Sequence, residues 1–184
     1  MRVIAGTARS LPLKTPEGMD TRPTTDRIKE TLFNMLQADI PGAVFVDLFS
    51  GSGGIGIEAL SRGAKKAYFV ENAPKAISCI QQNLSFTKLE DRAILLKQDA
   101  ASALSSIFEK EIDIIFMDPP YEAGLYTSVL ERIAENGLLK AEGYLIAEGS
   151  SQIALTIPKG MKILREKVYK TTTLTFLCAE EENV

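Results

Sequence analysis

The hydrophobic residues of the chain follow two spacings in turn. From residue 43 onward, short apolar runs typical of buried strands alternate with stretches whose apolar residues recur every three or four positions, as on one face of a helix. The predicted strands are residues 43–49, 66–71, 93–99, 112–118 and 143–149. The predicted helices between them are residues 54–63, 74–86, 100–110 and 125–137. Repeated strand–helix units predict an α/β fold with a mostly parallel sheet.

Both ends of the chain depart from this alternation. Residues 162–179 hold two β-prone runs with no helix between them, which predicts an antiparallel hairpin at the edge of a seven-stranded sheet. Residues 1–22 are rich in Gly, Pro and Thr and predict an arm or small hairpin, and residues 22–37 predict a helix. We therefore expect a single domain over residues 1–184, with the arm over residues 1–22 and the helix and core over residues 23–184.

Composition excludes several classes of protein. Hydrophobic residues make up 45% and charged residues 24% of the chain, as in ordinary globular domains. No signal peptide and no membrane span of roughly 20 apolar residues is found, so we expect a cytoplasmic protein with no membrane contact. The chain has no histidine, and Cys79 and Cys178 lie far apart. A metal site or a Ser-His-Asp triad is therefore not expected.

Charge is unevenly distributed along the chain. The net charge is −3, yet residues 1–29 carry six basic groups against three acidic ones. A second basic cluster lies within residues 159–170, where Glu166 is the one acid. Such clusters form either a solvated face or a phosphate-binding surface, and the sequence leaves both interpretations open.

Four successive predicted strands end at or beside an acid. In a doubly wound sheet, ligands bind outside the carboxyl ends of the strands. A single acid there is more often a helix cap or a solvated loop residue, but four together indicate a ligand site. The four acids are Asp47, Glu71, Asp99 and Asp118.

The turn after the first predicted strand matches the G-x-G-x-x-G pattern of dinucleotide-binding proteins. Residues 51–56 read GSGGIG, and Glu71 follows Gly51 by 20 residues, where it could accept ribose hydroxyls. An NAD enzyme is therefore one interpretation. However, a pyrophosphate requires a helix N-terminus clear of carboxylates. A ring of acids suits S-adenosylmethionine better, because its sulfonium and amino groups are cationic; Glu71 would bind its ribose and Asp99 its adenine.

The fourth predicted strand ends in Asp-Pro-Pro-Tyr, residues 118–121. The exocyclic amine of a nucleobase is a poor nucleophile, because its lone pair is delocalised into the ring. The Asp118 carboxylate and the Pro119 carbonyl could each accept one amine hydrogen and direct the lone pair to a methyl donor. Pro119 and Pro120 fix the backbone, and Tyr121 can stack on the base. The base must be extruded from a duplex or already unpaired.

Three motifs resemble those of one enzyme family. DPPY resembles the signature of amino-methyltransferases, and VDLFSGSGGIGIEALSRGA (46–64) resembles the cofactor motif of Rossmann-like methyltransferases. RPTTDRIKETLFNML (22–36) resembles the N-terminal signature of the RsmD family, which methylates a guanine N2 of small-subunit ribosomal RNA. The resemblance implies a Rossmann-like class I methyltransferase fold and S-adenosylmethionine-dependent methylation of a guanine N2 in 16S ribosomal RNA.

The resemblance also implies roles for particular residues. The cofactor positions are Asp47, Gly51, Ser52, Gly53, Glu71 and Asp99. The catalytic loop is Asp118, Pro119, Pro120 and Tyr121. The expected substrate-binding residues are Arg9, Arg22, Thr24 and Arg27. The implied partner is ribosomal RNA or the small ribosomal subunit, and we expect the protein to act as a monomer.

Other methyltransferases remain as alternatives. DNA adenine-N6 methyltransferases share DPPY but usually carry an added target-recognition domain, for which this chain length leaves no room. Carbon-5 cytosine methyltransferases need a cysteine nucleophile, and Cys79 falls inside a predicted helix far from DPPY in the sequence.

Overall fold

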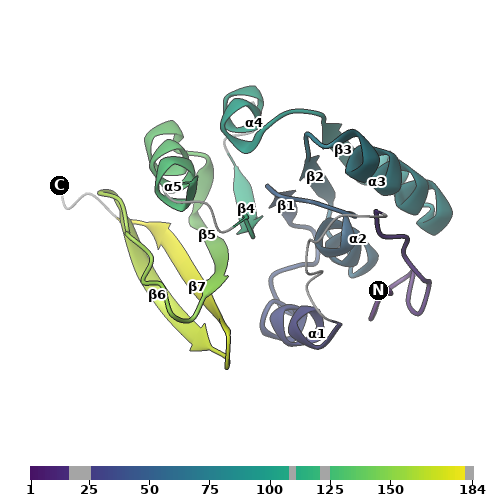
Figure 1. The fold of residues 1–184 in the computed structure, drawn as a ribbon, viewed down its shortest axis with the longest axis horizontal. Coiled ribbons are helices and arrows are strands. Elements are labelled where there is room, and N and C mark those ends of the chain that lie inside the picture. Colours follow the sequence, from purple (N-terminus) through teal and green to yellow (C-terminus); the bar gives the residue numbers. More distant parts are fainter. Residues whose placement is uncertain (17–25, 108–110, 121–124, 181–184) are drawn as a thin grey trace. The chain divides into compact units, whose positions relative to one another are not determined.

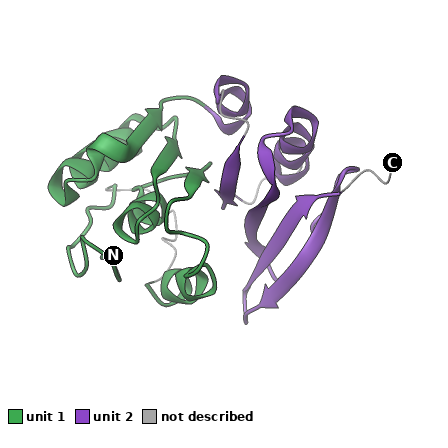
Figure 2. Ribbon diagram, turned by 180° about the vertical axis from the view of Figure 1, so that it is seen from behind, with its two compact units in different colours: residues 1–98 green, residues 99–184 purple. Residues whose placement is uncertain are grey.

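The computed structural model describes residues 1–16, 26–107, 111–120 and 125–180. The chain divides into two compact units, residues 1–98 and 99–184, which are coloured separately in Figure 2. We describe each unit by itself. No helix in the described part of the chain has the length and apolar character needed to cross a membrane.

The first unit contains three parallel strands in the order β3-β2-β1 (Figure 1). The strands are β1 (Val44–Asp47), β2 (Lys66–Val70) and β3 (Ala93–Leu96). The helices are α1 (Asp26–Met35), α2 (Gly54–Ser61), α3 (Pro74–Thr87) and the short η1 (Glu90–Arg92). The register pairs Asp47 with Phe69, so the carboxyl ends of β1 and β2 lie at the same edge. Asp47, which ends β1, and Glu71, which follows β2, are thereby brought together.

The second unit contains four strands in the order β4-β5-β7-β6. The strands are β4 (Ile112–Met117), β5 (Leu139–Ser150), β6 (Met161–Val168) and β7 (Thr172–Ala179), and the helices are α4 (Ala100–Ser106) and α5 (Leu125–Asn136). Strands β4 and β5 are parallel, whereas β7 is antiparallel to both β5 and β6. The predicted antiparallel hairpin at the C-terminal edge is therefore confirmed.

Most predicted elements are found at nearly the predicted bounds, and two differences have a local cause. Strand β5 begins at Leu139 rather than at 143, because Gly143 lies at a bulge where the register with β4 shifts. A Cβ on Gly143 would lie 2.6 Å from the Ile112 carbonyl oxygen, so only glycine fits there. Strand β3 ends at Leu96 because the chain turns before Asp99, which caps α4.

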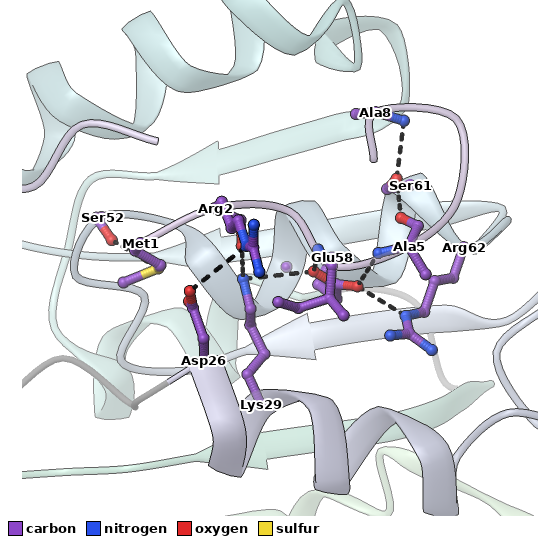
Figure 3. A network of polar contacts seen from close by, with 12 residues as sticks. Met1, Arg2, Ala5, Ala8, Asp26, Lys29, Ser52, Glu58, Ser61 and Arg62 are labelled. Carbon is purple, nitrogen blue, oxygen red and sulfur yellow. Dashed lines mark hydrogen bonds and ion pairs between the residues drawn. The ribbon is translucent and has the colours of Figure 1, made fainter. Parts of the chain in front are cut away.

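The N-terminal arm is fastened to α2 by the buried carboxylate of Glu58 (Figure 3). Glu58 accepts hydrogen bonds from the backbone N–H groups of Ile4 (2.8 Å) and Ala5 (3.0 Å). It also pairs with Arg62 at 2.8 Å and with Lys29 of α1 at 3.4 Å. Burial lowers the pKa of Lys29, and the Glu58 carboxylate opposes this effect. One acid thus connects the arm, α1 and α2.

Candidate functional site

The turn between β1 and α2 takes a backbone shape that glycine favours. Gly51 and Gly53 have φ values of 53° and 82°, in the left-handed region. The Gly53 N–H donates to the Ser50 carbonyl at 2.7 Å, and the Ser50 hydroxyl donates to the Asp47 carbonyl at 2.9 Å. A Cβ on Gly51 would meet nothing within 4 Å, so a ligand has room to approach the backbone there.

The buried carboxylate of Asp47 lies against the first turn of α2. Its Oδ2 accepts a hydrogen bond from the Gly56 N–H at 3.2 Å. Negative charge is favourable at this end of a helix. A Cβ on Gly56 would lie 2.4 Å from a ring carbon of Phe69 on β2, so glycine allows the helix to pack closely on the strand. These contacts hold the acid at the glycine turn.

Glu71, which directly follows β2, binds the glycine turn to the start of α3. Its Oε2 accepts from the Gly51 N–H, and its Oε1 accepts from the N–H groups of Asn72 and Ala73, each at 2.9 Å. A carboxylate has about four acceptor positions. Glu71 therefore supports the turn and retains capacity for the predicted ribose hydroxyls.

Asn83 of α3 is part of this site and was missed by the sequence interpretation. Its Nδ2 donates to the carbonyls of Ser52 and Lys14, each at 2.9 Å, and its Oδ1 accepts from the Lys14 N–H at 2.9 Å. The side chain is buried and holds the glycine turn and the arm together. A polar residue on the apolar face of the helix, three positions after Ile80, is the signal that could have revealed it.

Asp99 is the N-cap of α4. Its carboxylate accepts hydrogen bonds from the Ser102 N–H (2.9 Å) and the Ser102 hydroxyl (2.7 Å), and these hold the pKa of Asp99 below its usual range. The helix-cap interpretation of this acid is therefore seen in the structure. Its role at the adenine stays a prediction.

Asp118 directly follows β4 and is partly buried, and burial raises its pKa to about 6. Pro119 is buried and Pro120 is exposed, whereas Tyr121 lies outside the described residues. The Tyr126 hydroxyl lies 3.5 Å from the Pro119 carbonyl but donates to the Glu148 carbonyl at 2.6 Å. Because the hydroxyl has one proton and the shorter bond uses it, the Pro119 carbonyl keeps its acceptor capacity.

A fifth acid, Glu148 near the carboxyl end of β5, accompanies Asp118. The β4–β5 register pairs Met117 with Ala147, so Asp118 and Glu148 occupy the next position of the two strands. Burial, and then the charge of Asp118, raise the pKa of Glu148 to about 8. The sequence analysis missed this residue, although the rule that singled out four acids at strand ends also applies to the predicted strand 143–149.

The predicted substrate-binding residues are only partly within the described chain. Arg9 and Arg27 are exposed, while Arg22 and Thr24 lie outside the described residues. In the second basic cluster, the Arg165 guanidinium lies over the Phe176 ring, 4.1 Å from its centroid. The positions of Arg9 and Arg27 leave their charges accessible to a polyanion.

Comparison with known proteins assigns the chain to a family. A family model described as "Conserved hypothetical protein 95" matches residues 1–178. The chain is 35% identical over 171 residues to "Ribosomal RNA small subunit methyltransferase D" of Haemophilus influenzae, covering 91% of this chain and 88% of that protein. The chain belongs to the RsmD family. The resemblance found in the sequence motifs is thus confirmed.

Two further proteins are similar to this chain over most of its length. The Bacillus subtilis protein YlbH is 38% identical over 169 residues, covering 91% of this chain and 92% of YlbH. The solved structure of yhhF from Escherichia coli is 32% identical and matches with a TM-score of 0.86 over 99% of each chain. Together with the observed strands and helices, this likeness confirms the predicted class I methyltransferase fold.

Proposed function

We propose that this RsmD-family protein transfers a methyl group from S-adenosylmethionine to the exocyclic N2 amine of a guanine in 16S ribosomal RNA. The observation that carries the proposal is the pair of acceptors at the end of β4, the Asp118 carboxylate and the Pro119 carbonyl. An amine with two hydrogens matches two adjacent acceptors. The name of the Haemophilus influenzae relative supports ribosomal RNA of the small subunit as the substrate.

The first unit suits a cationic cofactor. Asp47 and Glu71 place two carboxylates at the glycine turn, and the space beside Gly51 lets a ligand reach the backbone. Two carboxylates disfavour the pyrophosphate of NAD. S-adenosylmethionine, when bound, supplies an electrophilic methyl group on a sulfonium. We assign Asp47, Gly51, Ser52, Gly53 and Glu71 to its binding.

Asp118 and Pro119 activate the amine by position rather than by strong basicity. Each accepts one N–H, which turns the nitrogen toward tetrahedral geometry and frees its lone pair for attack. After the N–C bond has formed, the nitrogen carries a positive charge and readily loses a proton. With a pKa of about 6, the Asp118 carboxylate is mostly ionised at pH 7 and can take up that proton. Tyr121 would stack on the base.

We expect weaker cofactor binding when Glu71 is changed to Ala. The variant loses the acceptor for three backbone N–H groups and the partner of the ribose. Hydrogen bonds to a charged group contribute roughly 1.5–3 kcal/mol, so affinity should fall at least about tenfold. Isothermal titration with S-adenosylmethionine measures this change. The matched control is Glu90→Ala, which changes an exposed acid of the same unit. If both variants bind S-adenosylmethionine with the same affinity, Glu71 is not part of the cofactor site.

The substrate can be tested directly by comparing the rates of methyl transfer to three substrates. Outside the core, the basic arm and the hairpin of β6 and β7 can hold phosphates, but phosphate contacts position a substrate without specifying its sequence. We therefore expect selection by the shape of a folded RNA with an unpaired target base. Tritiated methyl transfer should be high on small-subunit particles, low on naked ribosomal RNA and negligible on duplex DNA.

The other outcomes of this assay each carry a conclusion. Equal rates on particles and naked RNA would show that an assembled subunit is not needed to present the base. A preference for DNA would favour the adenine-N6 alternative. Mass spectrometry of the methylated nucleosides identifies the modified atom, and any product other than N2-methylguanine contradicts the proposal.

A further inference from the structure

Glu148 of β5 is a buried acid with a free acceptor position. The residue is 6% exposed, and its Oε2 has no hydrogen-bond partner among the described residues. The β4–β5 register places it beside Asp118, at the end of the neighbouring parallel strand. A buried polar atom without a partner is costly, so such an atom beside Asp118 calls for a functional explanation.

The groups around Glu148 offer no positive charge. Its neighbour directly after β4 is Asp118, and on β7 the residue opposite is the buried Leu174. The Tyr126 hydroxyl of α5 bonds the backbone carbonyl of Glu148. Lys167 of β6 lies one strand beyond Leu174 and is exposed. Within the described part of the chain, Asp118 is the charge that acts on Glu148.

A buried and a partly buried carboxylate side by side resist being ionised together. The environment separates their proton affinities, since the pKa of Asp118 is raised to about 6 and that of Glu148 to about 8. Between these values Glu148 is neutral and Asp118 is ionised. Acid pairs separated in this way take different roles in a reaction.

We propose that Glu148 is a positioning residue for Asp118, and that the two carboxyl groups hold a single proton between them while the amine is methylated. This inference rests on the proposed amine methylation. The unpartnered Oε2 carries the proton of the neutral Glu148 and donates it to one Asp118 oxygen once the substrate is bound, which leaves the other oxygen to accept the substrate N–H. The lone pair of the amine forms the N–C bond, and the C–S bond breaks with its electron pair on sulfur. The proton of the methylated amine passes to Asp118 and then to solvent.

The kinetic test uses two variants of Glu148 and one control. Glu148→Gln keeps a hydrogen-bond donor of similar shape, and its rate at pH 7 should stay close to that of the unchanged protein. Glu148→Ala removes the donor and should lower kcat about 10- to 100-fold. Glu142→Gln changes an exposed acid on the same strand and should have no effect. Titration with S-adenosylmethionine checks that each variant is folded.

The pH profile separates positioning from a structural role. The rate of the unchanged protein should rise with an apparent pKa near 6 and fall above about 8, as Asp118 and then Glu148 ionise. Glu148→Gln should keep the rise and lose the fall. A fall above pH 8 that persists in Glu148→Gln, or a Glu148→Ala variant with full activity, would overturn the proposal.

A second readout does not depend on activity. A raised carboxyl pKa means that the folded protein loses stability as pH rises from the unfolded value toward the folded one. The unchanged protein should therefore lose stability between pH 5 and pH 8 relative to Glu148→Gln, as measured by urea denaturation. A difference that is the same at both pH values refutes the shared proton. The pH-dependent difference in stability can also be seen while no substrate is methylated. In that case the proposed function and the positioning role of Glu148 are both wrong, and only the shared proton of the two carboxyl groups is supported.

Discussion

Changing Asp118 to Ala should reduce kcat by about 100- to 1,000-fold, the loss typical when a preorganised group that stabilises a transition state is removed. The variant leaves the Pro119 carbonyl as the one remaining acceptor of the proposed pair, so the lone pair is no longer directed at the methyl group. Single-turnover transfer of a tritiated methyl group measures the chemical step. Asp118→Asn keeps one oxygen acceptor but no charge, and its kcat should lie between those of Asp118→Ala and the unchanged protein.

Two controls distinguish lost chemistry from lost structure in Asp118→Ala. S-adenosylmethionine affinity should be unchanged, because the residues assigned to cofactor binding at the glycine turn belong to the first unit. Glu111→Ala, at an exposed acid just before β4, should retain full activity. Since burial raises the pKa of Asp118, its ionisation destabilises the fold as pH rises from about 4 to about 6. Asp118→Ala should therefore gain stability relative to the unchanged protein over this interval, and an unfolded variant would contradict this account.

Changing Glu58 to Ala should lower the free energy of unfolding by about 3–5 kcal/mol, the usual cost of breaking a buried ion pair from one side. Lys29 is 1% exposed and would remain buried without its carboxylate. The backbone N–H groups of Ile4 and Ala5 would also lose their acceptor. Urea denaturation measures the change.

Glu30 of α1 offers the matched control for Glu58. It is an exposed acid, and Glu30→Ala should change the free energy of unfolding by no more than about 0.5 kcal/mol. Glu58→Gln keeps one acceptor oxygen and should lie between the two variants. A loss below about 1 kcal/mol in Glu58→Ala would mean that the arm is held mainly by its apolar contacts.

Periodicity in the sequence was enough to predict the strands and the α-helices, because their apolar faces are set by local spacing, whereas the short η1 was not predicted. The run 172–179 coincides with β7, and the glycine pattern 51–56 is the observed turn into α2. The predicted ends of an element were less accurate where a contact of the backbone determines them. Gly143 lies inside β5 because its missing side chain accommodates the Ile112 carbonyl, which no pattern in the sequence reveals.

The polar residues that were missed depend on neighbours distant in sequence. Asn83 binds Lys14 and Ser52, and Glu58 binds the arm more than fifty positions before it. Glu148 lies next to Asp118 only because β4 and β5 pair in one particular register. By contrast, Asp47 and Glu71 of the first unit could be predicted, since parallel pairing of β1 and β2 alone brings their carboxyl ends to one edge. The roles of the acids with cofactor and substrate remain predictions.

The attachment of the N-terminal arm has a consequence for synthesis of the chain on the ribosome. The arm binds Glu58 and Ser61 of α2 and Asn83 of α3, so its last partner emerges 69 residues after Lys14. Because the ribosome adds about 5–20 residues per second, several seconds pass between the synthesis of Lys14 and that of its partner Asn83. During that time Val3, Ala8 and Leu13, which are buried in the finished protein, are exposed to solvent. The arm thus completes its contacts only after α3 has been made, and until then its apolar side chains are open to aggregation or chaperone binding.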